Sequence, residues 1–192
     1  MLRRLYDWTI SLAEHPKALW ALALVAFVES SVFPIPPDIL MIPMIIAAPR
    51  RAFRIAGVAM AASVLGGMLG YYIGWGLFES VGRPVLEFYG KTDAFASFAE
   101  RYNRYGAWAV LIAGVTPFPY KVITILSGST GLNLPIFIVS SVLARGARFF
   151  VIAALLWKFG EPIRDFIERK LGLMFVLFVA ILLGGFYLVR YL

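Results

Sequence analysis

The stretch Glu29-Ser-Ser-Val-Phe-Pro-Ile-Pro-Pro-Asp38 decides the fold, because it places three prolines and two carboxylates in the middle of a long apolar run. Each proline removes a backbone donor and pushes the preceding residue toward extended geometry, so a helix cannot continue through this point. The apolar halves on either side are too short to cross a bilayer, which needs about 20 residues. We therefore predict a re-entrant helical hairpin over 18–49, with its irregular tip surrounded by protein or by a water-filled cavity.

The composition of the whole chain is that of a membrane protein. Of its 192 residues, 61% are hydrophobic and 15% are charged. There is no cysteine and one histidine, His15, which excludes disulfides, thiolate chemistry and metal sites built from several imidazoles. We expect no metal, no cofactor and no enzymatic activity. Glu29 interrupts the first apolar run and no small-residue cleavage site follows it, which argues against a removed signal peptide.

The charge balance points to a membrane surface as the partner of the basic residues. Eighteen Lys and Arg against eleven Asp and Glu give a net charge of +7. This is the positive-inside bias of an inner-membrane protein, and it places the basic turn 50–54 in the cytoplasm. A nucleic-acid partner is not expected, because no soluble basic face is evident.

A second broken run lies in residues 107–131, around Gly114-Val-Thr-Pro-Phe-Pro-Tyr-Lys121. Its segment 117–121 aligns with 34–38, so each run has a Pro-x-Pro turn at its centre. We predict that this run is a second re-entrant hairpin. The prolines expected to shape the two tips are Pro34, Pro36, Pro37, Pro117 and Pro119.

The order of elements predicts an inverted repeat. Only one span separates the two hairpins, so the second enters from the opposite face, as in many secondary transporters. We expect one all-α integral membrane domain over 1–192, in which each hairpin is followed by a transmembrane helix. The other elements are an interfacial linker helix and an extra C-terminal transmembrane helix. The predicted spans are 55–79, 134–157 and 171–189, and the interfacial helix is predicted over 84–105.

Three glycines repeat at every fourth position, Gly66, Gly70 and Gly74, and form one stripe on the predicted span 55–79. Small residues at this spacing favour close packing of helices in membranes. The alternative is that the stripe lets a substrate approach the backbone.

Five ionisable residues lie inside apolar stretches: Glu29, Asp38, Lys121, Arg145 and Arg148. Each costs about 2.5–3.5 kcal/mol at a bilayer centre on insertion scales, so we expect them to pair or to touch water. Asp38 and Lys121 occupy equivalent repeat positions with opposite charge, and we predict that they approach one another, directly or across a small cavity. That pair is either a structural lock between the tips or a protonatable switch with an anion anchor.

Glu29 is the best proton-carrier candidate, because a low-dielectric site disfavours a charged carboxylate. The alternative is a carboxylate bonded to the broken hairpin backbone. Arg145 and Arg148 are three residues apart, on one helix face, and two guanidinium groups suit a phosphate. Alternatively they pair with Glu29 and Asp38 in a resting state, from which an incoming phosphate displaces the carboxylates as these become protonated. Hydroxyls that could line the path are Ser30, Ser31, Thr116, Thr124, Ser127 and Ser129.

Four motifs in order carry a family resemblance: Glu29–Asp38, Gly66-Gly-Met-Leu-Gly-Tyr-Tyr-Ile-Gly74, Thr116-Pro-Phe-Pro-Tyr-Lys121 and Arg145-Gly-Ala-Arg-Phe149. Over roughly residues 20–160 the chain resembles the DedA family, also called the SNARE-associated or VTT domain superfamily, and most closely its YqaA-like branch. The resemblance implies a bacterial inner-membrane protein with two re-entrant hairpins that moves polyprenyl phosphate or phospholipid, often linked to the proton gradient. It also implies functional roles for Glu29 and Asp38 in the first hairpin, and for Arg145 and Arg148 after the second.

The chain departs from the family at Gly114, where many members have arginine, and Lys121 is the candidate replacement. The expected function is that of a lipid-phosphate transporter or flippase, whose partners are membrane lipids, an anionic lipid-phosphate substrate and protons or sodium. Alternatives are a small ion or solute carrier, a membrane-integrity factor without a substrate, and a Ser–Lys hydrolase using Lys121. A homodimer is left open.

Overall fold

The computed structural model describes residues 17–32, 36–116 and 118–160, and the regular elements in these ranges are helices. Two of them are long and apolar enough to cross a membrane, Pro49–Phe88 and Leu134–Gly160. They contain the predicted spans 55–79 and 134–157. The predicted span 171–189 and two of the tip prolines, Pro34 and Pro117, lie outside the described residues.

The first apolar run is broken as predicted, into α2 (Ala18–Ser31) and α3 (Asp38–Ala47). α3 begins directly behind Pro37, and Asp38 lies in its first turn, where a carboxylate suits the positive end of the helix dipole. With 14 and 10 residues, the helices are about 21 Å and 15 Å long. Both are shorter than the roughly 30 Å hydrocarbon layer of a bilayer.

The helix after this hairpin is longer than predicted. η1 (Pro49–Arg51), α4 (Ala52–Leu77), η2 (Phe78–Gly82) and α5 (Arg83–Phe88) join into one helical segment of 40 residues, about 60 Å long. η2 is a wider π-type turn that directly precedes Arg83-Pro84. A proline ring clashes with the carbonyl four residues earlier, and the wider turn accommodates it without ending the helix.

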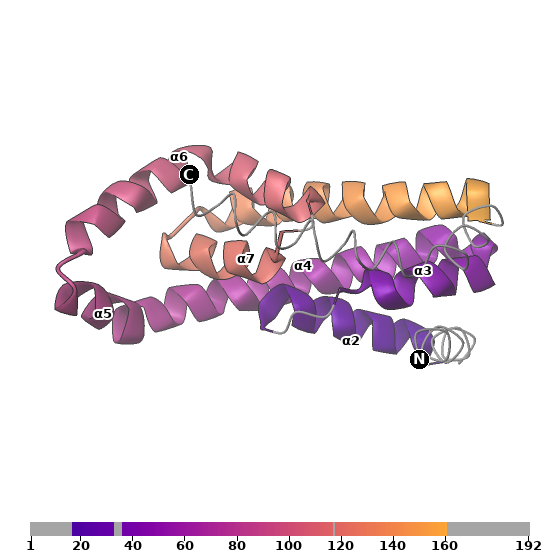
Figure 1. Ribbon diagram of the computed structural model, residues 1–192, viewed down its shortest axis with the longest axis horizontal. Helices are drawn as coiled ribbons and strands as arrows, with labels where there is room; N and C mark the ends of the chain where they lie inside the picture. Colours follow the sequence, from indigo (N-terminus) through magenta and orange to yellow (C-terminus); the bar gives the residue numbers. More distant parts are fainter. Residues whose placement is uncertain (1–16, 33–35, 117, 161–192) are drawn as a thin grey trace, which may run out of the picture.

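The expectation of a single interfacial helix over 84–105 is wrong. The range is divided at Gly90 between α5 and α6 (Thr92–Val115), and α6 continues into the second broken run. Gly90 has a φ of +62°, which ends α5 in a glycine cap. The amides of Gly90 and Lys91 donate to the carbonyls of Glu87 and Leu86 at 3.1 and 2.8 Å. The chain therefore turns back on itself here (Figure 1).

The second broken run consists of the end of α6 and α7 (Tyr120–Ser129), with the break at 116–119 as predicted. α7 ends at a second glycine cap, where Gly131 has a φ of +67° and Leu132 N donates to Ser127 O at 2.9 Å. The helix Leu134–Gly160 follows, and the Asn133 side chain accepts a hydrogen bond from Ile136 N at 3.2 Å in its first turn.

The two broken segments approach the middle of the molecule from opposite ends (Figure 1). α2 and α3 occupy the right-hand half of that view, and α6 and α7 the left-hand part. The helices α4 and Leu134–Gly160 run past both. Each pair packs into its own core: one contains Leu22, Met41, Ile45, Ile55 and Phe149, and the other contains Tyr71, Val110, Tyr120, Leu132 and Phe137.

The glycine stripe of α4 packs against both broken segments. A Cβ at Gly66 would lie 2.0 Å from the Phe27 carbonyl oxygen of α2, and one at Gly74 would lie 1.9 Å from the Ile125 carbonyl oxygen of α7. The prediction of close helix packing is confirmed. α4 is thus the element that brings the two hairpins side by side.

The outer surface of the bundle is strongly apolar. Large hydrophobic side chains are more than half exposed along the outside of the helices, which is expected where lipid rather than water surrounds the protein. They include Trp20, Leu24, Leu65, Trp75, Trp108, Ile112, Val139, Leu143 and Val151.

Candidate functional site

A layer of polar side chains separates the two apolar cores. On α4, Ser63 lies between Ala59 of the first core and Tyr71 of the second. On the helix Leu134–Gly160, Arg145 lies between Phe137 of the second core and Phe149 of the first. Both polar residues are buried, so the layer lies inside the protein and not on its surface.

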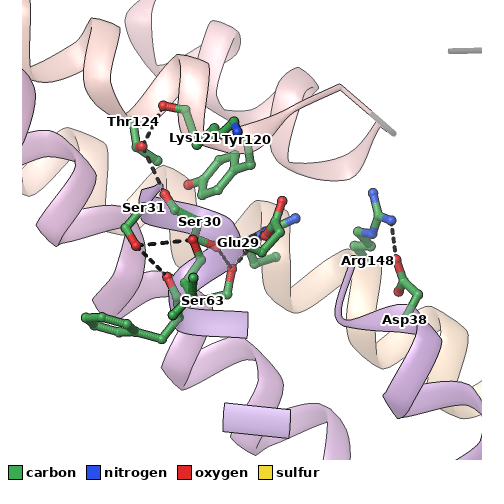
Figure 2. A network of polar contacts seen from close by, with 12 residues as sticks. Glu29, Ser30, Ser31, Asp38, Ser63, Tyr120, Lys121, Thr124 and Arg148 are labelled. Carbon is green, nitrogen blue, oxygen red and sulfur yellow. Dashed lines mark hydrogen bonds and ion pairs between the residues drawn. The ribbon is translucent and has the colours of Figure 1, made fainter. Parts of the chain in front are cut away.

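Arg145 is the centre of this layer. It is only 2% exposed, and its guanidinium forms an ion pair with Glu29 at the end of α2. It also donates to Ser63 Oγ at 2.6 Å and to Ser30 Oγ at 3.1 Å. Ser30 and Ser63 are themselves 2.7 Å apart, so α2, α4 and the helix Leu134–Gly160 meet at one hydrogen-bonded cluster (Figure 2).

Aromatic rings complete the surroundings of Arg145. Its guanidinium carbon lies 4.3 Å from the centre of the Tyr120 ring and 5.3 Å from that of Phe149. Such stacking is favourable for arginine and worth more where water is excluded. The Tyr120 hydroxyl donates to Ser141 at 2.5 Å, which fixes the ring at the start of α7. Tyr120 of the second hairpin therefore shields the charge of Arg145, which Glu29 of the first hairpin neutralises.

Arg148 and Asp38 form a second pair, separate from the first (Figure 2). The Arg148 guanidinium donates to Asp38 Oδ2 at 2.5 Å and to the Thr116 carbonyl at 2.9 Å. Their side chains are 19% and 17% exposed, compared with 3% for Arg145. Asp38 Oδ1 and Arg148 Nε are buried and have no hydrogen-bond partner within the described ranges. This pair is therefore more accessible and less fully bonded than the first.

Asp38 and Lys121 do not pair directly, so that form of the prediction is wrong, while their approach across a small cavity stays a prediction. Asp38 pairs with Arg148, and the Lys121 amine donates to the Val32 carbonyl at 3.3 Å. Val32 ends α2, where carbonyls lack helical partners and attract a cation. The alternative in which the two arginines pair with the two carboxylates is confirmed. Lys121 still links the two hairpins, as does Thr124, which donates to the Ser30 carbonyl at 3.0 Å.

The sequence profile of the VTT domain family matches residues 35–158, which include α3 to α7 and most of the helix Leu134–Gly160. The chain belongs to the VTT domain family. An uncharacterized protein from Haemophilus influenzae and its homolog from Histophilus somni are each 34% identical over 168 residues. The alignments cover 85% of this chain and 87% of each relative. No solved structure matches the chain.

This VTT domain protein has no room for the arginine that the resemblance places at position 114. A Cβ at Gly114 would lie 2.6 Å from the Ala144 Cβ, directly beside Arg145 in sequence. Lys121 does not take over that place, because its amine points to the end of α2. The cations that face the carboxylates are therefore Arg145 and Arg148.

The sequence did not identify Ser63 and Tyr120 as site residues. A lone serine inside the apolar span was the available signal for Ser63, while Tyr120 looked like one of many membrane aromatics. Of the hydroxyls expected along the path, Ser30 and Thr124 join the cluster. Ser31 bonds back to its own helix, at the Phe27 carbonyl, so it makes no contact between the hairpins through that bond.

Proposed function

We propose that this VTT domain membrane protein moves a lipid phosphate, either polyprenyl phosphate or a phospholipid, across the bacterial inner membrane, coupled to the proton gradient. One observation carries the proposal: two arginines on one helix face are each neutralised by a carboxylate of the first hairpin, between two apolar cores. Five charged residues in apolar stretches, counting Lys121, would be costly to retain without a use.

The exchange of anions is the proposed chemical step. A guanidinium fork binds a carboxylate and a phosphate with the same geometry. Protonation of Asp38 or Glu29 removes its negative charge and releases its arginine, which can then bind a phosphate head group. Loss of the proton restores the carboxylate and expels the phosphate. Arg148 is the proposed first contact, because its pair with Asp38 is more exposed than the pair between Arg145 and Glu29.

An inverted repeat is the architecture that suits this exchange. We propose that α2–α3 and α6–α7 are re-entrant hairpins from opposite faces, each followed by a span, within the YqaA-like branch of the family. The support is that both breaks lie near the middle of the long axis and come from opposite ends (Figure 1). Rocking of one unit against the other would expose the arginines to each side in turn.

A transporter is preferred to an intramembrane enzyme. A Ser–Lys hydrolase would need the Lys121 amine beside a serine hydroxyl. In the part of the chain that the structure describes, that amine donates instead to the Val32 carbonyl. For the orientation, we propose that the basic turn 50–54 is cytoplasmic.

Reconstituted liposomes test the function. We would follow the transbilayer movement of labelled polyprenyl phosphate and phospholipid, with and without a pH gradient, for the wild type, Arg148→Ala and Glu29→Gln. Movement is expected for the wild type and a loss of at least tenfold for both variants. Glu100→Gln and Arg104→Ala are matched controls, because they change an exposed ion pair on α6.

Equal movement in wild type, Arg148→Ala and Glu29→Gln liposomes would refute the lipid-phosphate mechanism. The second candidate is a carrier of a small anion or solute, favoured by the same arginine pairs. Flux of a soluble anion that depends on Arg148, without movement of either lipid, would select that candidate.

A further inference from the structure

At one end of the molecule, the described residues include several cations and no carboxylate. Arg50 and Arg51 lie in η1, Arg54 lies in the first turns of α4, and Lys158 lies near the end of the helix Leu134–Gly160. All four are exposed. The elements that carry them end together at the right-hand side of Figure 1. We call these four residues the basic collar.

Carboxylates in the described ranges lie elsewhere. Glu29 and Asp38 are paired in the polar layer, and the others fall within residues 79–100, toward the opposite end. At that opposite end Arg83 and Arg104 form ion pairs with glutamates one helical turn away. The three collar arginines form no ion pair with a carboxylate in the described ranges of the chain, and the first turn of α4 has no acidic residue.

Aromatic side chains mark the level of this end in a bilayer. Phe53 stacks with Phe150 at 6.3 Å and contacts Trp157 at 5.9 Å between ring centres, and all three are exposed. Exposed tryptophans such as Trp157 are enriched at the boundary between hydrocarbon and head groups. Because Phe53 and Trp157 adjoin collar residues in sequence, the collar would lie at the head-group level of a surrounding bilayer.

We propose that the basic collar binds the head groups of anionic phospholipids in the adjoining leaflet, and that the folded protein is therefore more stable with them than with zwitterionic lipids. Arg50 and Arg54 are four residues apart and Arg51 and Arg54 three, so the guanidiniums share one side and repel one another. A lipid phosphate with net negative charge relieves that repulsion and accepts paired hydrogen bonds. A phosphatidylcholine head group has no net charge to contribute. The proposal concerns a surface remote from the arginine–carboxylate pairs and does not rest on the transport function.

The experiment uses the purified full chain in a nonionic detergent. Phosphatidylglycerol or phosphatidylcholine with the same acyl chains is added, and the thermal midpoint and the lipid retained in native mass spectrometry are measured. We expect a higher midpoint and greater retention with phosphatidylglycerol. Each basic residue near an anionic surface contributes about fivefold in binding, so R50Q/R51Q/R54Q should reduce the preference for phosphatidylglycerol by at least tenfold.

Three controls make the result decisive. R83Q/R101Q/R104Q removes as many cations from the opposite end and should keep the preference. R50K/R51K/R54K keeps the charge and should retain most of the preference for phosphatidylglycerol. Raising the salt to about 0.5 M should weaken this preference by screening. Equal responses to the two lipids, equal losses in both glutamine variants, or an equal effect of soluble glycerol phosphate would overturn the proposal. If R50Q/R51Q/R54Q does not fold, the lysine variant and the salt series decide it.

Discussion

Replacing Gly74 by alanine should push α7 of the second hairpin away from α4. A Cβ there would lie 1.9 Å from the Ile125 carbonyl oxygen, and real contacts of a Cβ are essentially never below 3.0 Å, so α4 and α7 must move apart by about 1.1 Å. Backbone atoms cannot relieve the clash by changing rotamer, which places the cost near the upper end of overpacking, about 3 kcal/mol. Because alanine is a better helix former than glycine, the substitution also stabilises the helix by up to about 1 kcal/mol. The expected net loss in the free energy of unfolding is about 2 kcal/mol.

Reversible unfolding in mixed micelles, from nonionic detergent toward dodecyl sulfate, measures this loss. Gly66→Ala is the parallel test on α2, because its Cβ would lie 2.0 Å from the Phe27 carbonyl oxygen. Gly57→Ala and Gly76→Ala are matched controls in the same helix, where an added Cβ meets nothing within 4 Å. They should be neutral or stabilising by up to about 1 kcal/mol. If Gly74→Ala were as stable as Gly76→Ala, α7 would not pack on α4 as described.

Two further predictions concern the charges between the hairpins. Glu29→Leu and Arg145→Met should each lower the free energy of unfolding by about 3–5 kcal/mol, because each leaves a buried charge unpaired. In a double-mutant cycle of unfolding free energies, the double variant should lose much less than the sum of the two single losses. Additive losses would contradict the pairing. Lys121→Met should lower the free energy of unfolding by no more than about 1 kcal/mol, because it removes one contact of a partly exposed amine. A loss as large as that of Arg145→Met would indicate that Lys121 forms a buried ion pair.

The sequence predicted the breaks in the chain well, because prolines act locally. Three prolines within 34–37 end a helix whatever surrounds them, and the structure has α2 and α3 on either side. The glycine stripe was equally readable, since its spacing alone places Gly66, Gly70 and Gly74 on one face. By contrast, the single Gly90 belongs to no repeating pattern, so the sequence did not predict the helix end there. The charges around it favoured a continuous surface helix.

The partners of the charges could not be predicted in the same way. Position in a repeat aligned Asp38 with Lys121, but the reach of a lysine depends on where nearby acceptors lie. The end of α2 offers a carbonyl at Val32 without a helical partner, and the amine binds there. Arg148 then faces Asp38 because it lies one turn beyond Arg145 on a helix that passes both hairpins.

The difference between the two ion pairs gives the site a direction. The pair of Arg145 and Glu29, which we call the inner pair, is held by Ser30, Ser63 and the Tyr120 ring, so Arg145 can leave Glu29 only if several contacts break together. The pair of Arg148 and Asp38, which we call the outer pair because it is more exposed, has one bond between the side chains, and one atom of each has no hydrogen-bond partner among the described residues. An arriving anion would therefore exchange at the outer pair first, and the inner pair would keep the hairpins together while it does so.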